Sequence, residues 1–313
     1  MSEREPTEAE ATRLAPLLPK MILRLGGTKP EGLTISDNGA PIVVDGRFDE
    51  AVWKTAPVVG DFIQREPSEG AAPTEATEAR VAFDDVALYV AVRAFDHEPE
   101  RITGQLTRRD ERSPSDWLKV AVDSYYDHRT AYEFGVNPAG VKTDRYYFND
   151  GQNDDSWDAV WDVQVSRDDN GWNAEFRIPF SQLRFNPGVR AFGFGVWRDI
   201  ARRNERVAWP AYKTSRSTLA SQLGTLEGFG GIQRSSRLEV LPYVLTKNVT
   251  EPGLDGWNHP QKVTGGVDLK YGITANATLD ATVNPDFGQV EVDPAVLNLS
   301  AFEVRFEERR PFF

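Results

Sequence analysis

The sequence contains no cysteine, only three histidines and only two methionines. The lack of cysteine excludes disulfides, thiolate metal sites and cysteine nucleophiles. The histidines, His97, His128 and His259, form no pair with the spacing of metal ligands, and no HExxH motif is present. Chemistry in this chain therefore has to come from carboxylates, guanidinium groups and aromatic rings.

An excess of positive charge and a long hydrophobic run are also missing. The chain carries 36 Lys and Arg against 48 Asp and Glu, a net charge of −12, which argues against a nucleic-acid partner. No stretch approaches the roughly 18 apolar residues of a membrane helix. The first 27 residues open acidic and place two prolines in a short apolar patch, so they form a poor signal peptide.

Alternation with a period of two dominates the middle of the chain. Leu88, Val90 and Val92 alternate with more polar or smaller neighbours, and "EARVAF", "DD" and "VALYVAVRAFD" together predict a hairpin. The segment "AYEFGVNPAGVKTDRYYF" predicts two strands about a Pro-Ala-Gly turn, and "WDAVWDVQVSRDDNGWNAEFRIPF" predicts two more about Asp-Asp-Asn-Gly at 168–171, a strong turn signal. Many short strands with frequent Gly and Pro turns predict an all-β antiparallel β-sandwich of the jelly-roll or immunoglobulin-like kind.

The composition changes at both ends, which divides the chain into three parts. The sequence predicts a poorly structured tail for residues 1–40 and the sandwich for residues 41–230. A second alternating pattern begins near residue 237, where Val267, Leu269 and Tyr271 share one face of an expected strand. Such strands occur in membrane barrels and in soluble sheets alike, so alternation alone leaves both open.

The stretch "NDDSWDAVWD" at residues 153–162 sets two tryptophans among four aspartates. Indole and phenol rings can stack on the C–H faces of sugars, whereas Asp, Asn, Arg and Gln suit sugar hydroxyls. If Trp157 and Trp161 lay in one strand, they would be roughly 13 Å apart, too far to clamp one ring. Aromatic candidates are Trp117, Tyr125, Tyr126, Tyr146, Tyr147, Trp157, Trp161, Trp197 and Trp209. From the whole set we select Trp157, Trp161, Tyr146, Trp117 and Arg198 as candidate carbohydrate-binding residues.

The clustered aspartates allow two interpretations. A glycosidase needs two carboxylates at a set separation, and a calcium ion needs several oxygen ligands. No EF-hand loop is present, so the candidate calcium ligands are Asp110, Asp116 and Asp144. No catalytic residue is assigned.

Several segments in order resemble the carbohydrate-binding module family 9-like domain: "VDGRFDEAVW", "VAFDDVALYVAVRAFDHEP", "DDSWDAVWDVQVSRDDNGWNAEFRIPF" and "GFGVWRDIARRNERVAWP". The segment "NPDFGQVEVDPAVLNLSAFEVRFEERRPFF" resembles the start of the DUF5916 domain, which leads into an outer-membrane β-barrel in Gram-negative bacteria. The resemblance implies a sandwich that binds poly- or oligosaccharide between aromatic rings, with structural calcium, beside xylan-degrading or other glycoside hydrolases. It implies that residues 237–313 are the first part of a truncated barrel-type domain.

Three functions remain open at this point. The first is a non-catalytic carbohydrate-binding module that acts in carbohydrate catabolism at the cell envelope. The second is a glycoside hydrolase that cleaves O-glycosyl bonds. The third is a structural cap on an outer-membrane barrel. The resemblance implies an exported protein of the periplasm or outer membrane, although no signal peptide is visible, and we expect the true start to lie upstream.

Overall fold

The structure is a computed structural model that describes residues 32–34, 42–186, 188–229, 232, 238–248, 251–253, 256–258, 261–272 and 278–284. The chain forms two units, one from most of residues 1–235 and one from residues 236–313, and each is taken by itself below. The predicted tail at 1–40 lies outside the described residues except for 32–34, which form strand β1 (Gly32–Thr34) rather than irregular chain.

The first unit is built almost entirely from strands. Within its described residues the α-helix is α2 (Ala51–Thr55), and the short 3₁₀ turns are η1 (Pro99–Arg101), η2 (Ala201–Arg203) and η3 (Ala220–Gln222). Its strands after β1 are β2 (Ile63–Glu66), β3 (Thr77–Phe83), β4 (Ala87–Phe95), β5 (Trp117–Asp123), β6 (Ala131–Val136), β7 (Lys142–Phe148), β8 (Gln152–Asp154), β9 (Asp162–Asp168), β10 (Gly171–Pro179), β11 (Ala191–Ile200), β12 (Glu205–Trp209) and β13 (Gly224–Glu227).

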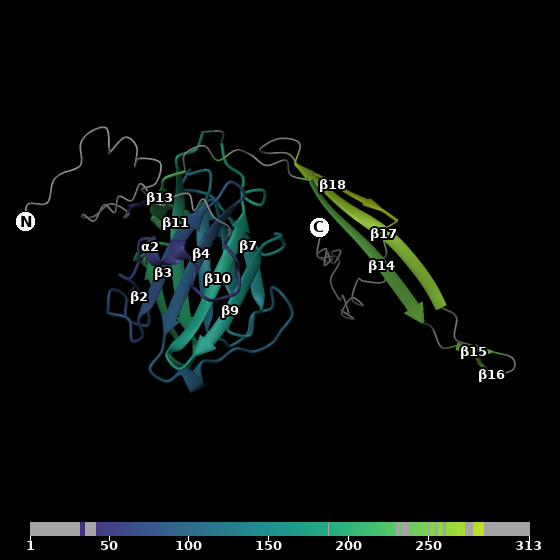
Figure 1. Cartoon of the computed structure of the whole chain (residues 1–313), viewed down its shortest axis with the longest axis horizontal. Coiled ribbons are helices and arrows are strands. Elements are labelled where there is room, and N and C mark those ends of the chain that lie inside the picture. Colours follow the sequence, from purple (N-terminus) through teal and green to yellow (C-terminus); the bar gives the residue numbers. More distant parts are fainter. Residues whose placement is uncertain are drawn as a thin grey trace, which may run out of the picture. The chain divides into compact units, whose positions relative to one another are not determined.

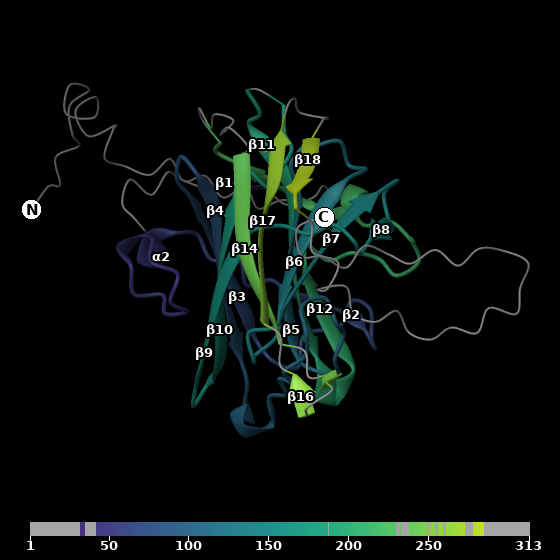
Figure 2. The same ribbon diagram turned by 90° about the vertical axis from the view of Figure 1, so that its right-hand side faces the viewer.

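These strands form two sheets that lie face to face (Figures 1 and 2). The larger, nine-stranded sheet runs β1-β13-β11-β5-β6-β7-β8, and β12 and β2 extend it beside β11. The smaller sheet runs β3-β4-β10-β9. Every pairing is antiparallel except that of β1 with β13. The structure therefore confirms the predicted all-β antiparallel sandwich and the predicted β3–β4 hairpin.

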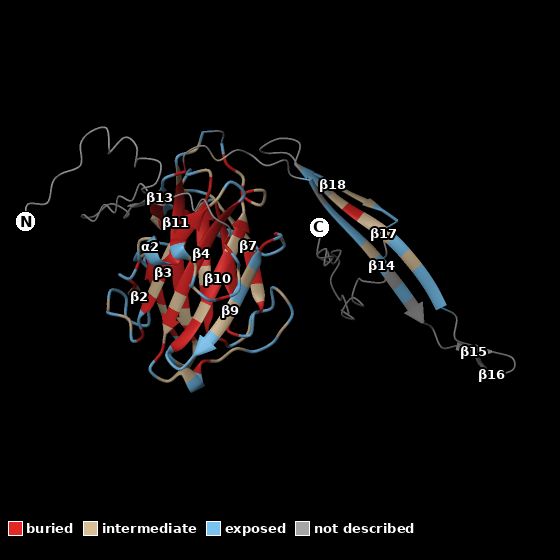
Figure 3. Ribbon diagram, viewed as in Figure 1, coloured by how far each residue is buried: buried red, intermediate tan, exposed pale blue. Residues whose placement is uncertain are grey.

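Most residues of the central strands of the sandwich are buried (Figure 3), and large rings are prominent among them. Trp161 packs edge-on against Phe134 of β6, with ring centroids 5.3 Å apart, and stacks on Phe176 of β10 at 5.9 Å. It thus joins both sheets, and its burial removes a large apolar area from water. Both Trp157 and Trp161 precede β9, which begins at Asp162, so the separation worked out for a shared strand does not apply.

The outer face of the smaller sheet is covered by the N-terminal segment that contains α2. Val52 and Trp53 of this helix are buried against Tyr89 and Ala91 of β4. Gly46 has φ +80° and lies against the backbone of β9, where an added Cβ would come within 3.1 Å of a carbonyl carbon. Only glycine adopts this conformation readily, which accounts for the Asp-Gly turn.

A buried carboxylate fixes this segment in place. Glu175 of β10 accepts hydrogen bonds from the backbone N–H groups of Asp45 and Gly46, each at 3.0 Å, and from the indole N–H of Trp53 at 2.9 Å. Burial raises the pKa of Glu175, although these three donors oppose that shift. The sequence "VDGRFDEAVW" therefore folds around one side chain more than 120 residues away.

The outer face of the nine-stranded sheet is only partly covered. Leu219, Ala220 and Leu223 pack on Trp197 and Ala121, and Tyr212 lies against the same group. The rest of this face is left concave, and it holds the pocket described below.

The second unit is a three-stranded antiparallel sheet with a small hairpin. Its order is β14-β17-β18, and the hairpin pairs β15 with β16. The strands are β14 (Leu238–Asn248), β15 (Glu251–Gly253), β16 (Gly256–Asn258), β17 (Gln261–Gly272) and β18 (Thr278–Val283). Pairing of Val240 with Leu269 and of Leu269 with Ala281 gives one apolar face, as the alternation predicted. The described part of the chain holds no helix whose length and hydropathy would let it span a bilayer.

Candidate functional site

The main cavity among the described residues lies on the outer face of the nine-stranded sheet and has a volume of about 580 Å³. Side chains of β2, β5, β6, β7, β11 and β12 form its floor, and loops at 112–115 and 212–219 form part of its wall. A volume between about 300 and 1,000 Å³ is typical of small-molecule sites. The cavity is therefore large enough for a ligand such as an oligosaccharide.

Strand register brings the floor residues together. Trp197 of β11 lies opposite Lys119 of β5, and Lys119 lies opposite Gly135 of β6. Two residues on, Asp199 lies opposite Arg206 of β12. Because alternate residues of a strand share a face, Trp197 and Asp199 both face the pocket.

The floor is close-packed at Gly135. A Cβ added there would come within 2.6 Å of Thr143 Oγ1 and 3.3 Å of Lys119 Cγ. The glycine lets these two neighbouring side chains occupy the space above it. Its φ lies outside the left-handed region, so the requirement is for space and not for a special backbone conformation.

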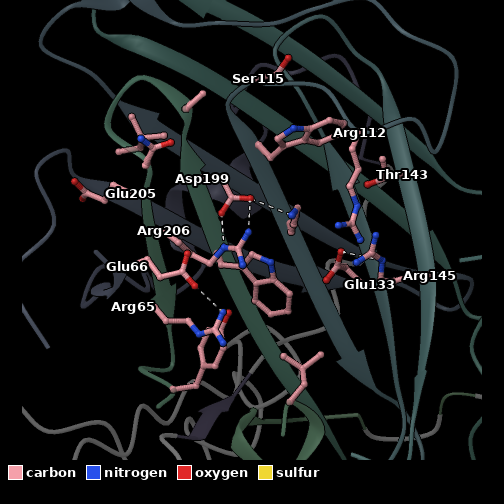
Figure 4. A pocket seen from close by; sticks show the side chains of 18 of the residues that line it. Arg65, Glu66, Arg112, Ser115, Glu133, Thr143, Arg145, Asp199, Glu205 and Arg206 are labelled. Atoms are coloured by element: carbon pink, nitrogen blue, oxygen red, sulfur yellow. Dashed lines mark hydrogen bonds and ion pairs between the residues drawn. The ribbon is translucent and has the colours of Figure 1, made fainter. Parts of the chain in front are cut away.

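Asp199 is the ionic centre of the floor (Figure 4). Lys119 Nζ lies 3.0 Å from Asp199 Oδ2, and Arg206 donates to both carboxylate oxygens, one of them through Nη2 at 2.9 Å. Burial alone would raise the pKa of Asp199, but the two cations outweigh it and hold the pKa below its ordinary value. Asp199 is thus a fixed anion with its hydrogen-bonding capacity largely used.

A second polar group lies across the floor on β6 and β7. The hydroxyl of Tyr147 donates to Glu133 Oε2 at 2.9 Å, and Arg145 Nε lies 3.7 Å from Glu133 Oε1. Burial, followed by the charge of Glu133, raises the pKa of Tyr147 well above its ordinary value. Tyr147 therefore stays protonated and acts as a hydrogen-bond donor.

Aromatic rings complete the wall. Trp117 and Trp197 contribute little ring surface, because they are only 6% and 4% exposed. The ring of Tyr212 is partly exposed and lies 6.0 Å from that of Trp197, with the guanidinium of Arg65 4.3 Å above it. The pocket thus combines apolar ring surface with many polar groups, as sugar sites require.

The side chains that were selected from the sequence as candidate carbohydrate-binding residues do not lie together in the structure. Trp117 lies in the pocket, and its indole N–H donates to the carbonyl of Ser113 at 3.3 Å. Tyr146 lies outside the pocket lining and packs on Tyr132, with ring centroids 5.2 Å apart. Trp157 is partly exposed in the loop between β8 and β9, also outside the lining.

Two selected residues are in the core. Trp161 is 1% exposed, and Arg198 is fully buried, where it donates to the backbone carbonyls of Ala76 at 3.1 Å and Phe95 at 2.8 Å. The prediction did not anticipate that these side chains point between the sheets. A direct sugar contact from either would require the core to open, so neither enters the site proposed below.

The three candidate calcium ligands do not lie in one cluster either. Asp110 and Asp144 come together, with carboxylate oxygens within 4.8 Å of one another, whereas Asp116 accepts from the backbone N–H of Ala201 in a different cluster. Arg109 already occupies this pair, since its Nη2 lies 2.5 Å from Asp144 Oδ1 and its Nε 3.4 Å from Asp110 Oδ2.

These contacts decide how well a calcium ion would fit. The second oxygen of Asp144 accepts from the backbone N–H of Ala159 at 2.7 Å, so Asp144 has little capacity left for a metal. Burial, with a smaller contribution from the charge of Asp144, raises the pKa of Asp110 to about 6, and the charge of Arg109 opposes this shift. The fit of a calcium ion is therefore poor at Asp144, and calcium binding stays a prediction.

The candidate residues chosen from the sequence include few of those that line the pocket. Lys119, Glu133, Arg145, Asp199, Arg206 and Tyr212 were not chosen. Tyr147 and Trp197 were among the wider set of aromatic candidates. Alternation could have placed Trp197 and Asp199 on one face, but the partner strands that complete the site depend on register, which the sequence does not show.

Comparison with known families defines the class of protein. The model for the carbohydrate family 9 binding domain-like family matches residues 44–227, more than half of the chain. The chain therefore belongs to this family, as the sequence motifs predicted. A second model, for the domain of unknown function DUF5916, matches residues 235–313. No curated protein matches the sequence.

Solved structures of low identity are similar to the first unit. One is a carbohydrate binding module family 9 from Caldicellulosiruptor kristjanssonii in complex with glucose, with 18% identity and a TM-score of 0.48 over 64% of this chain and 97% of that one. The same module in complex with cellotriose has 17% identity and a TM-score of 0.48 over 64% of this chain and 95% of that one.

Proposed function

We propose that the sandwich is a non-catalytic module that binds an oligosaccharide in the pocket of its nine-stranded sheet. The observation that carries the proposal is the partly exposed ring of Tyr212 beside Trp197, in a pocket that is also lined by Trp117 and by hydrogen-bonding groups. Sugars offer a C–H face to such rings and hydroxyls to such groups. Membership of a family described as carbohydrate-binding supports the same function.

The carboxylates of the pocket favour binding over hydrolysis. A glycosidase needs a carboxylic acid with a raised pKa to protonate the leaving oxygen. The pKa of Asp199 is instead lowered by its two cations, and Glu133 accepts a hydrogen bond from the hydroxyl of Tyr147. These groups are arranged to hold the pocket in shape.

Isothermal titration calorimetry of the full chain with glucose, cellotriose and xylotriose tests this proposal. We expect Tyr212→Ala to weaken binding about three- to tenfold, as loss of one stacking ring implies, and Trp157→Ala to leave it unchanged. The reverse pattern would place the site at Trp157, and absence of binding to any saccharide would refute the proposal. Release of reducing sugar from xylan would favour the hydrolase.

Action in carbohydrate catabolism at the cell envelope, export and association with an outer membrane remain proposals. Fractionation of cells that express the full-length gene product, with detection of the chain in envelope fractions, would support them. Detection of the chain only in the cytoplasmic fraction would contradict them.

A further inference from the structure

We infer that the pocket prefers a saccharide that carries a carboxylate, such as a uronate-containing oligosaccharide, over its neutral counterpart. This inference rests on the proposed function, because it names the class of sugar that the same pocket would take. It depends on the charges that line the pocket and on how many of the anions are already engaged.

The side chains that line the pocket carry a net positive charge, opposite in sign to that of the whole chain. Six basic and four acidic side chains line the pocket, although the chain as a whole carries −12. A cleft lined by an excess of one sign raises the local concentration of ligands of the opposite sign. The basic residues are Arg65, Arg112, Lys119, Arg145, Arg206 and Arg216.

Three of the four anions that line the pocket are held by donors of the protein, and the fourth, Glu66, is half exposed and pairs with Arg65 at 3.3 Å. Asp199 is held by Lys119 and Arg206. Glu205 is turned away to Thr74, whose backbone N–H and hydroxyl it accepts at 2.9 and 2.7 Å. What the pocket offers a ligand is thus mainly N–H donors, which call for acceptors.

Two arginines converge at one side of the pocket. Arg145 Nε lies 3.0 Å and Arg112 Nη2 4.0 Å from the carboxylate of Asp155, which is 56% exposed at the side chain. Figure 4 shows Arg112 and Arg145 together on the side of the pocket that also carries Glu133. Two guanidinium groups that share one solvent-exposed carboxylate form a ready site for a second carboxylate.

A buried donor supports the same conclusion. The Nε atom of Arg65 is buried and has no hydrogen-bond partner among the described residues, whereas Arg145 Nε has the carboxylate of Asp155 at 3.0 Å. Buried polar groups in proteins are nearly always paired. Arg65 lines the pocket, so an acceptor-rich ligand would supply the partner that its Nε atom lacks.

Matched ligand pairs that differ only in charge test the inference. Calorimetry would compare trigalacturonate with its methyl ester, and a glucuronic-acid-substituted xylo-oligosaccharide with the same oligosaccharide after carboxyl reduction. We expect the acidic member of at least one pair to bind about tenfold more tightly at 20 mM NaCl. This advantage should shrink several-fold at 300 mM, because salt screens charge interactions.

Three variants and one control locate the effect. Arg112→Gln and Arg216→Gln should each weaken the acidic ligand about two- to fivefold and leave the neutral ligand unchanged. Asp155→Asn removes the competing carboxylate and should strengthen the acidic ligand by a similar factor. Arg190→Gln makes the same charge change at an exposed position outside the lining and should have no effect.

The outcomes separate this inference from the proposed function. Equal affinities within both pairs would overturn the preference for carboxylates and leave saccharide binding intact. Weaker acidic binding in Asp155→Asn would also overturn it, because that carboxylate would then help the ligand. If neutral and acidic saccharides all failed to bind, both proposals would fall.

Discussion

Arg198 provides the most demanding test of the structure, because sequence reasoning placed it in a sugar site and the structure places it in the core. It belongs to a largely buried ionic cluster of three guanidinium groups and three carboxylates, and the partly exposed Glu98 lies at the edge of this cluster, 3.8 Å from Arg202 and 3.7 Å from Arg203. The members are Arg198, Arg202, Arg203, Glu75, Asp96 and Asp116. Burial lowers the pKa of Arg198 to about 10, against the pull of Asp116 and Asp96.

The substitution Arg198→Met keeps the apolar length of the side chain and removes its charge. Asp96 keeps Arg202, which donates to it twice at 2.7 Å, but Asp116 keeps only the N–H of Ala201. One buried carboxylate is then in excess. Breaking a buried pair in this way costs about 3–5 kcal/mol, and we expect the free energy of unfolding at pH 7.5 to fall by that amount.

Denaturant unfolding followed by tryptophan fluorescence measures the loss. Burial already raises the pKa of Asp116, and loss of Arg198 should raise it further, so the variant should recover stability as the pH falls from 7.5 to 5. The double variant R198M/D116N removes the excess carboxylate and should be more stable than R198M alone. A loss below about 1 kcal/mol, or additive losses in the double variant, would refute the cluster as the reason for burying Arg198.

Three further predictions concern other buried groups. Glu175→Gln replaces one acceptor by a donor and should lower the free energy of unfolding by about 2–3 kcal/mol in chemical denaturation, whereas an unchanged midpoint would contradict the anchoring role. Burial raises the pKa of Asp123 from its ordinary value to about 6. The stability that Asp123 contributes is therefore complete below about pH 4 and is lost as the pH rises through 6. Relative to Asp123→Asn, the wild type should lose up to about 3 kcal/mol across that window, and a flat difference would contradict the shift. Gly135→Ala forces Thr143 or Lys119 to move and should cost about 1–3 kcal/mol of stability, with weaker saccharide binding by calorimetry; a variant unchanged in both would contradict the close-packed floor.

Local patterns made the fold predictable. The alternation over 77–95 and the Asp-Asp-Asn-Gly turn at 168–171 fix two hairpins without any long-range information, and the structure has both. The motif around Asp45 and Gly46 marked the start of the sandwich. What holds that motif is Glu175, and nothing in the local sequence identifies that partner, because the contact spans more than 120 residues.

The site was harder to predict, because binding roles were inferred from residue type alone. The sequence did not show to which face of the sheet each side chain points. Arg198 and Asp199 are adjacent in β11, and a strand turns adjacent side chains to opposite faces. Arg198 therefore enters the core, where it pairs with Asp96, while Asp199 faces the pocket and pairs with Lys119 and Arg206. A shift of one residue in assigning the faces of this strand therefore selects the buried Arg198 in place of Asp199, which faces the pocket.

The two faces of β11 also explain why the pocket tolerates so much charge. The inner face gains its stability from Phe192, Phe194 and Val196, all fully buried, so the outer face is free to carry residues chosen for a ligand. Leu223 covers one end of that face beside Trp197, and Asp199 lies near the other end of the strand, where the pocket is. One side of β11 is apolar except for the buried Arg198, and the other side carries Trp197 followed by Asp199, so the strand offers a sugar aromatic surface and charge along one line.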